Sequence, residues 1–150
     1  MAHFQAELPT DLIKTFEMIG ANAQKMLGEM TQAGAEVVRV NIIANAPDSF
    51  ADSDIMRCLE VTKTYMTPSD DGINTKVAFY GYFTPKRSPG PKWIATHGHG
   101  RMAAELVCNV FEYGRSGPYF PERPFIRKSF RKDQIEAAML KVQNKYIPEE

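Results

Sequence analysis

Apolar side chains in the first third of the chain recur with the spacing of amphipathic helices. Between residues 12 and 19 they repeat at three- and four-residue intervals behind a cap-forming Thr-Asp pair, which predicts a short helix that ends at Gly20. A second apolar stripe predicts a longer helix over residues 22–45, and Pro47 ends it. Small residues near the middle of this helix, among them Gly34, favour a close approach of another segment.

After residue 58 the spacing changes to the alternation that is typical of β-strands. It predicts one strand over residues 59–66 and a second over residues 75–84, separated by the turn-forming residues 68–72. Two strands joined by so short a turn are expected to pair as an antiparallel hairpin.

Proline and glycine dominate the segment that follows the second strand. Residues 85–100 hold three of each, which predicts a flexible loop without helix or strand. Apolar spacing over residues 102–111 favours a helix closed by Gly114, with a strand from Leu106 as the alternative. Residues 115–124 are rich in proline and predict an irregular connector.

A last helix is predicted over residues 125–146, with Pro148 as its end. Together the elements predict a single α+β domain over residues 1–150, a length that suits one hydrophobic core. In this domain the long N-terminal helix and the C-terminal helix pack on a small antiparallel β-sheet.

The composition is typical of a folded domain and argues against a disordered or a fibrous protein. Of the 150 residues, 43% are hydrophobic and 24% are charged, close to globular averages. Eighteen basic residues balance eighteen acidic ones, so the chain as a whole has no charge-driven attraction to nucleic acid or to a membrane. The pattern shows neither a secretory leader nor a spanning stretch, and we expect synthesis in the cytoplasm. Cys58 and Cys108 lie in apolar stretches, which suits a reducing compartment.

Candidate catalytic residues do not assemble into a known pattern. His97 and His99 could in principle bind a metal, but their loop lacks carboxylates and thiols at ligand spacing. Neither cysteine lies in a nucleophile motif, and no phosphate-binding glycine loop occurs. The sequence therefore predicts a structural protein rather than an enzyme, with no cofactor and no metal. A metal-dependent hydrolase centred on the two histidines is the catalytic alternative.

Charge is uneven near the C-terminus. Between residues 122 and 146, seven basic residues accompany three acidic ones, which gives a local charge of +4. Such a stretch suits contact with nucleic acid or with an acidic partner, or forms a solvated helix face. The candidate DNA-facing residues are Lys128, Arg131 and Lys132. A small cytoplasmic nucleic-acid-binding module that uses this basic helix is one alternative function.

The most specific motif of the chain lies between residues 110 and 127. Residues 112–114 read Glu-Tyr-Gly, a loop with prolines follows, and residues 123–127 read Arg-Pro-Phe-Ile-Arg. This pattern resembles the neck, or head–tail joining, proteins of tailed bacteriophages, also described as tail-completion or minor tail components. In that family an aromatic-Glu-aromatic-Gly segment precedes a loop and a Pro-Phe-Leu/Ile-Arg start of the last helix.

The first half of the chain is similar to that family in the order of its elements. A long helix ends in Ala-Pro, here residues 46–47, and a linker and two strands follow. The family usually has Thr-Gly-x-Leu-Arg after the Ala-Pro, which residues 53–57 only approximate, and residues 85–100 are similar to an insertion beyond the family core.

The resemblance implies a structural protein of the virion, assembled in the host cytoplasm. Such a protein forms a homo-oligomeric ring in the phage neck, joins the head-closure complex to the tail, and lets the genome pass through its lumen. Its implied partners are further copies of itself, head-closure and tail proteins, and genomic DNA in transient contact, with no membrane. A tail terminator ring that caps the tail tube is the alternative.

The motif residues are the candidate contacts between subunits. Pro124 restricts the backbone, which would present Phe125 as an apolar anchor. Glu112 can accept hydrogen bonds from Arg123 or Arg127, either across a subunit boundary or within one chain. Repetition of one head-to-tail contact closes into a ring when the rotation permits. The candidate interface residues are Glu112, Tyr113, Arg123, Pro124, Phe125 and Arg127.

Overall fold

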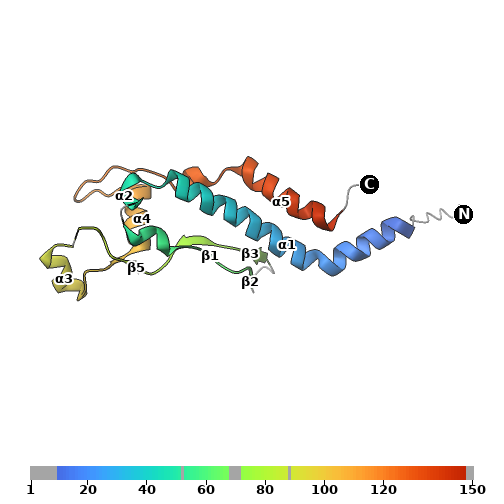
Figure 1. The fold of residues 1–150 in the computed structure, drawn as a ribbon, viewed down its shortest axis with the longest axis horizontal. Helices are drawn as coiled ribbons and strands as arrows, with labels where there is room; N and C mark the ends of the chain where they lie inside the picture. The colour runs from blue at the N-terminus through green and yellow to red at the C-terminus, as the bar shows by residue number, and fades with distance from the viewer. Residues whose placement is uncertain (1–9, 52, 68–71, 88, 148–150) are drawn as a thin grey trace, which may run out of the picture.

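The computed structural model describes residues 10–51, 53–67, 72–87 and 89–147. Its fold is α+β, as predicted, with a long N-terminal helix, a C-terminal helix and small antiparallel sheets. The molecule is elongated, and helix α1 (Thr10–Asn45) runs along much of its long axis (Figure 1).

Helix α1 continues through Gly20, so the predicted break at that residue is wrong. Glycine costs about 1 kcal/mol relative to alanine inside a helix, and the continuous hydrogen bonding of a 36-residue helix outweighs this cost. The two helices expected over the first 45 residues are therefore one. The predicted end is confirmed, because α1 stops at Asn45, two residues before Pro47.

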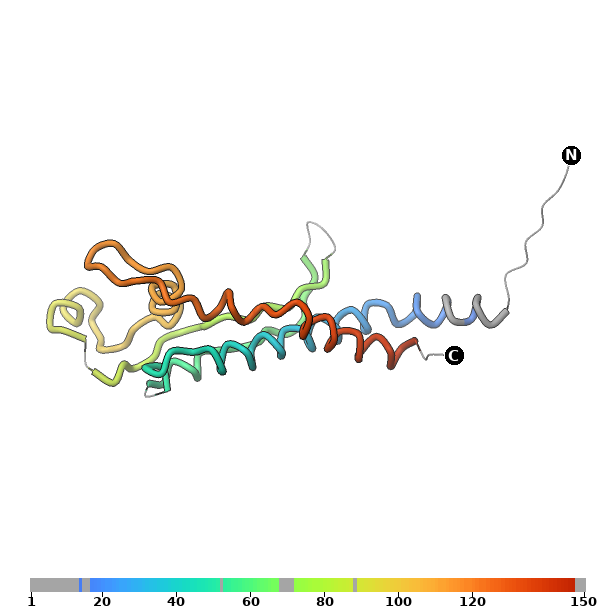
Figure 2. Tube along the Cα trace, turned by 90° about the horizontal axis from the view of Figure 1, so that it is seen from above, coloured from blue at the N-terminus to red at the C-terminus, as the bar shows by residue number. Residues whose placement is uncertain are grey.

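Helix α5 (Lys132–Tyr146) lies beside α1 (Figure 1 and Figure 2). The two helices approach each other closely at Gly34, where an added Cβ would stand 3.1 Å from Cγ2 of Ile135. Further along, the Tyr146 hydroxyl donates a hydrogen bond to the Glu29 carboxylate at 2.8 Å. The expectation that a small residue in the long helix permits a close approach is confirmed.

The described residues form six short strands, which pair antiparallel. The pairs are β1 (Leu59–Val61) with β4 (Val77–Phe79), β2 (Tyr65–Thr67) with β3 (Gly72–Asn74), and β5 (Tyr82–Phe83) with β6 (Met102–Ala103). The predicted hairpin is thus present as two consecutive ladders. Residues 68–71 of the predicted turn lie outside the described residues.

Each predicted strand is shorter than expected because the hairpin is interrupted at Thr62 and Lys76. The Thr62 N–H donates to the Lys76 carbonyl at 2.8 Å, but the Lys76 N–H donates to the Thr62 hydroxyl at 2.9 Å. A side chain replaces a main-chain acceptor there and separates the two ladders. Gly81, with φ 78°, then turns the chain away from β4, so that β5 pairs with β6 instead.

Helix α3 (Pro91–His97) lies in the segment that was expected to have no regular structure, and that prediction is wrong. Pro91 stands in the first turn, where a missing N–H costs nothing. Gly98 ends the helix in the left-handed conformation, with φ 70°. The residues that suggest a loop are therefore the start and stop signals of a seven-residue helix.

Helix α4 (Ala104–Tyr113) is capped by Gly114, as predicted. The connector after it is irregular, also as predicted, and holds one bridge between Arg115 and Phe120. The last helix begins later than expected, because a single 3-10 turn, η2 (Arg127–Ser129), precedes α5. Two further short helices, α2 (Asp48–Ala51) and η1 (Asp54–Cys58), join α1 to β1.

The hydrophobic core lies where the second half of α1 meets β1, β4, α4 and the connector. Phe125 is 2% exposed, and its ring packs edge-on against those of Phe50 and Phe79, at centroid distances of 5.4 Å and 6.1 Å. Within the described ranges, none of the helices has the length and apolar character that crossing a membrane requires.

Candidate functional site

One buried carboxylate organises the sequence motif between residues 112 and 127. Glu112 occupies the last turn of α4 and is 2% exposed. Its Oε2 accepts the main-chain N–H groups of Phe125 at 2.8 Å and Ile126 at 2.9 Å, and its Oε1 accepts that of Arg127 at 2.9 Å. The Arg127 Nε donates to the same Oε1 at 2.8 Å. Four donors therefore converge on one side chain.

These hydrogen bonds explain why the connector can enter η2 without a local cap. The first N–H groups of a helical turn have no partner within the turn and require an external acceptor. No side chain next to η2 caps it. Glu112 supplies the acceptors from α4, and its negative charge suits the positive end of the turn.

Burial raises the pKa of the Glu112 carboxyl, but hydrogen bonds lower it by more. The donors are the main-chain N–H groups of Arg127, Ile126 and Phe125 and the Arg127 side chain. Each of them favours the ionised form, so the pKa lies below the usual range of a glutamate. The carboxylate stays charged at neutral pH.

We expect the lowered pKa of Glu112 to make the fold sensitive to acid. Its contribution to the free energy of unfolding is complete above the unfolded-state pKa of about 4.3 and is lost as pH falls through the lower folded-state pKa. Urea titrations between neutral pH and about pH 3 should show the wild type losing its advantage over Glu112→Gln in that acidic window. A gap between the two proteins that stays constant over this range would contradict the assignment.

The Arg127 side chain lies on the solvent side of the Glu112 carboxylate and links it to neighbouring groups. Its Nη2 donates to the Glu112 carbonyl at 2.9 Å and to the Glu122 carboxylate at 3.4 Å. The guanidinium also lies 5.2 Å from the centroid of the Tyr113 ring. Because the Arg127 side chain is 52% exposed, solvent weakens its ion pairs, and its main contribution is to fix geometry.

The connector is held in shape by main-chain hydrogen bonds at both ends. Arg115 and Phe120 exchange two of them, at 2.9 Å and 2.8 Å, and the Arg123 N–H donates to the Phe111 carbonyl at 2.7 Å. The peptide bond between Gly117 and Pro118 is cis. Tyr119 stands at the tip and is 80% exposed. An irregular segment is thus ordered and presents an aromatic side chain to solvent.

We expect Gly114→Ala to disrupt this connector. Gly114 has φ 73° and ψ −176°, a combination almost confined to glycine, and an added Cβ would stand 2.8 Å from the Phe120 carbonyl oxygen. The substitution should lower the free energy of unfolding by about 2 to 4 kcal/mol in urea titrations. Gly81→Ala is the control, because φ is 78° there but nothing lies within 4 Å of the added Cβ. Equal losses in the two variants would show that the close contact at Gly114 does not matter.

The structure places Glu112 and Phe125 in the interior of the chain. Both are 2% exposed, and Glu112 binds Arg127 of its own chain. The intramolecular bond, left open as an alternative, is present. Arg123 is not among the donors to Glu112, and its guanidinium lies over the Phe120 ring at 5.4 Å. Phe125 packs in the core of its own chain, and a contact with a second subunit stays a prediction.

The other candidate interface residues lie at the surface, and their contact role stays a prediction. Tyr113 is 65% exposed, Arg123 is exposed, and Pro124 is half-buried. Sequence reasoning missed Tyr119, because exposure at the tip of an irregular connector has no periodic signal. It also missed Ser129, which is fully buried and whose hydroxyl donates to the Phe125 carbonyl at 2.6 Å.

The three candidate DNA-facing residues are exposed, but two of them have acidic neighbours. Arg131 pairs with Asp133 at 3.5 Å, and Lys132 pairs with Glu136 at 3.5 Å. Such exposed pairs are weak, yet they reduce the local positive field. Only Lys128 of the three has no carboxylate partner within the described part of the chain.

His97 and His99 make separate contacts. The His97 ring stacks on Trp93 at a centroid distance of 3.8 Å, and its Nδ1 lies 3.0 Å from the Trp93 carbonyl. His99 accepts the Arg101 N–H at 3.1 Å, and its ring packs edge-on against Tyr82. The described residues contain no group of three or more His, Cys, Asp or Glu side chains that could hold a metal ion.

We expect metal removal to leave the protein unchanged. Both His97 and His99 are exposed and engaged by neighbours, so neither is arranged as a ligand with a complete donor set. Melting curves with and without a chelator should coincide, and metal analysis should find less than one ion per chain. A bound ion whose removal lowers the melting temperature would favour the hydrolase alternative.

No protein-family model, no curated protein and no solved structure matches the chain. The resemblance to phage neck proteins therefore rests on the sequence motif and on the order of elements.

Proposed function

We propose that this chain is a structural protein of the neck of a tailed bacteriophage. Copies of it form a ring that joins the head-closure complex to the tail and leaves a lumen for the genome. It is assembled in the host cytoplasm and stays in the virion. One observation supports this function above all: the motif residues that resemble the neck family form a single cross-linked unit around Glu112.

This unit gives the surface beside it the rigidity that an assembly contact needs. A segment that is ordered before binding loses less conformational entropy when it binds. The connector between α4 and η2 is irregular but is tied at Gly114, at Phe120 and at Glu112. Tyrosine and arginine are common among residues that dominate binding energy, and Tyr119 and Arg123 are exposed on it.

The elongated shape also supports a place in a ring. The connector and α3 lie at one end of the long axis, and the start of α1 lies at the other (Figure 1 and Figure 2). A subunit whose distinct ends contact different neighbours forms heterologous contacts, which close into rings when the rotation between subunits permits.

A head–tail joining assay tests this function. Inactivation of the gene in a phage that carries it should yield filled heads and separate tails, and added wild-type protein should join them. Arg123→Glu should reduce joining, whereas Lys141→Glu, a charge reversal at an exposed site on α5, should not. Both variants should melt like the wild type. Infectious, joined particles in the absence of the protein would overturn the proposal.

A further inference from the structure

Strand β4 has one edge that no other described strand covers. Its register with β1 pairs Ala78 with Glu60, and the flanking bonds join the Lys76 carbonyl and the Tyr80 N–H to the β1 side. Because the polar groups of successive residues point to opposite edges of a strand, those of Val77 and Phe79 point away from β1. These two residues therefore offer free N–H and C=O groups to an added strand.

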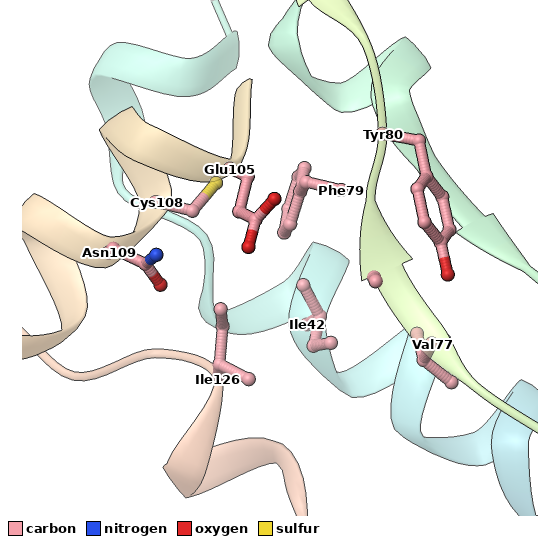
Figure 3. Close-up of a pocket in the computed structure, with 9 residues that line it drawn as sticks. Ile42, Val77, Phe79, Tyr80, Glu105, Cys108, Asn109 and Ile126 are labelled. Carbon is pink, nitrogen blue, oxygen red and sulfur yellow. The ribbon is translucent and has the colours of Figure 1, made fainter. Parts of the chain in front are cut away.

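A groove lies against this free edge. It has a volume of about 320 Å³, and Figure 3 shows β4 on one side and α4 on the other. Ile42 of α1 and Ile126, just before η2, contribute apolar side chains, and the exposed Glu105 and Asn109 of α4 make the opposite wall polar. A bare strand edge beside a groove with an apolar floor is the arrangement that binds an extended peptide by strand addition.

The first residues of the chain have a sequence that suits this groove. Residues 3–8 read His-Phe-Gln-Ala-Glu-Leu, so that Phe4, Ala6 and Leu8 alternate with polar residues. Alternation with a period of two places the apolar side chains on one face of an extended segment. That face suits contact with the apolar floor of the groove, and the polar face suits exposure to solvent.

The same segment is too short to reach the groove of its own chain. Nine extended residues span at most about 32 Å. From Thr10, where α1 begins, to Ile42 in the groove there are 32 helical residues, which cover about 48 Å at 1.5 Å each. A groove filled by this segment is therefore filled by a second copy of the chain.

We propose that residues 3–8 of one copy add as a β-strand to the free edge of β4 in the next copy. The main-chain groups of Val77 and Phe79 would bind the arm, and Ile42 and Ile126 would contact its apolar face. The contact joins opposite ends of two molecules, so its repetition builds a ring or a filament. The closure of this contact into a ring rests on the proposed function. The contact itself is inferred only from the groove and from the sequence of residues 3–8.

Sedimentation of full-length variants tests the contact. Wild type should self-associate as its concentration is raised to on the order of 1 mM, where even an interaction of about −4 kcal/mol is half formed. Phe4→Asp, on the apolar face of the arm, and Asn109→Trp, in the groove, should each weaken association about tenfold or more. The matched controls are Gln5→Asp on the polar face and Leu106→Trp, exposed on α4 but outside the groove.

Mixing the two defective variants gives the sharpest result. Phe4→Asp retains an intact groove and Asn109→Trp retains an intact arm, so the mixture should form one-to-one heterodimers and nothing larger. Self-association of Phe4→Asp at wild-type strength, a wild type that stays monomeric over the whole range, or a mixture without heterodimers would each overturn the inference. If one of these results were found together with a positive head–tail joining assay, the neck function would be retained and the subunits would contact each other through other surfaces.

Discussion

Glu112→Gln should destabilise the folded chain by about 3 to 5 kcal/mol. The substitution keeps the shape of the side chain but removes its charge and puts an amide NH2 group where an oxygen accepts hydrogen bonds. At least one main-chain N–H among those of Phe125, Ile126 and Arg127 is then buried without an acceptor. Urea titrations at neutral pH, followed by circular dichroism, measure the change.

Glu122→Gln is the matched control for this result. Glu122 also accepts a hydrogen bond from Arg127, at 3.4 Å, but its side chain is 64% exposed. An exposed ion pair contributes at most about 1 kcal/mol, so this variant should unfold almost like the wild type. Similar small losses in both variants would contradict the role of Glu112 as the buried organiser of the motif.

Phe125→Ala should cost about 3 to 5 kcal/mol, because it removes a fully enclosed aromatic ring and leaves a cavity. The ring packs against Phe50 and Phe79, and these edge-on contacts are lost with it. Thermal melts and urea titrations should show a large loss of stability. The Phe125→Ala protein that remains folded should still join heads to tails, because the contacts between subunits are made by other residues.

Phe130→Ala, five residues further along, is the control for Phe125. Its side chain is 58% exposed, so truncation removes little buried surface and should change stability by less than about 1 kcal/mol. If Phe125→Ala were as stable as Phe130→Ala but failed to join heads to tails, Phe125 would be a contact residue after all, as the sequence motif first suggested.

The sequence predicts elements well where one physical signal dominates. Helical spacing alone locates the second half of α1 and most of α5, and alternation locates the hairpin. The predictions are wrong where one residue type is compatible with two kinds of local structure. Gly20 suggests a helix end but is tolerated inside a long helix, and Pro91 and Gly98 suggest a loop but delimit α3.

The buried role of Glu112 could not be predicted from local pattern. Its acceptors serve N–H groups more than ten residues away, in a segment without periodic structure, and only the folded chain brings them together. The motif does indicate that Glu112 interacts with Arg123 or Arg127, and the structure shows the bond to Arg127. It does not distinguish a bond within one chain from a bond between two, because the chemistry of the pair is the same in both cases.

Immunogold labelling of purified phage particles tests the neck assignment most directly. The particles should come from a phage whose genome encodes this sequence, with an antibody raised against the full chain. The account predicts label at the junction between head and tail on most particles, and none on particles assembled without the protein. Absence of the protein from mature particles, or label confined to another part of the virion, would contradict it.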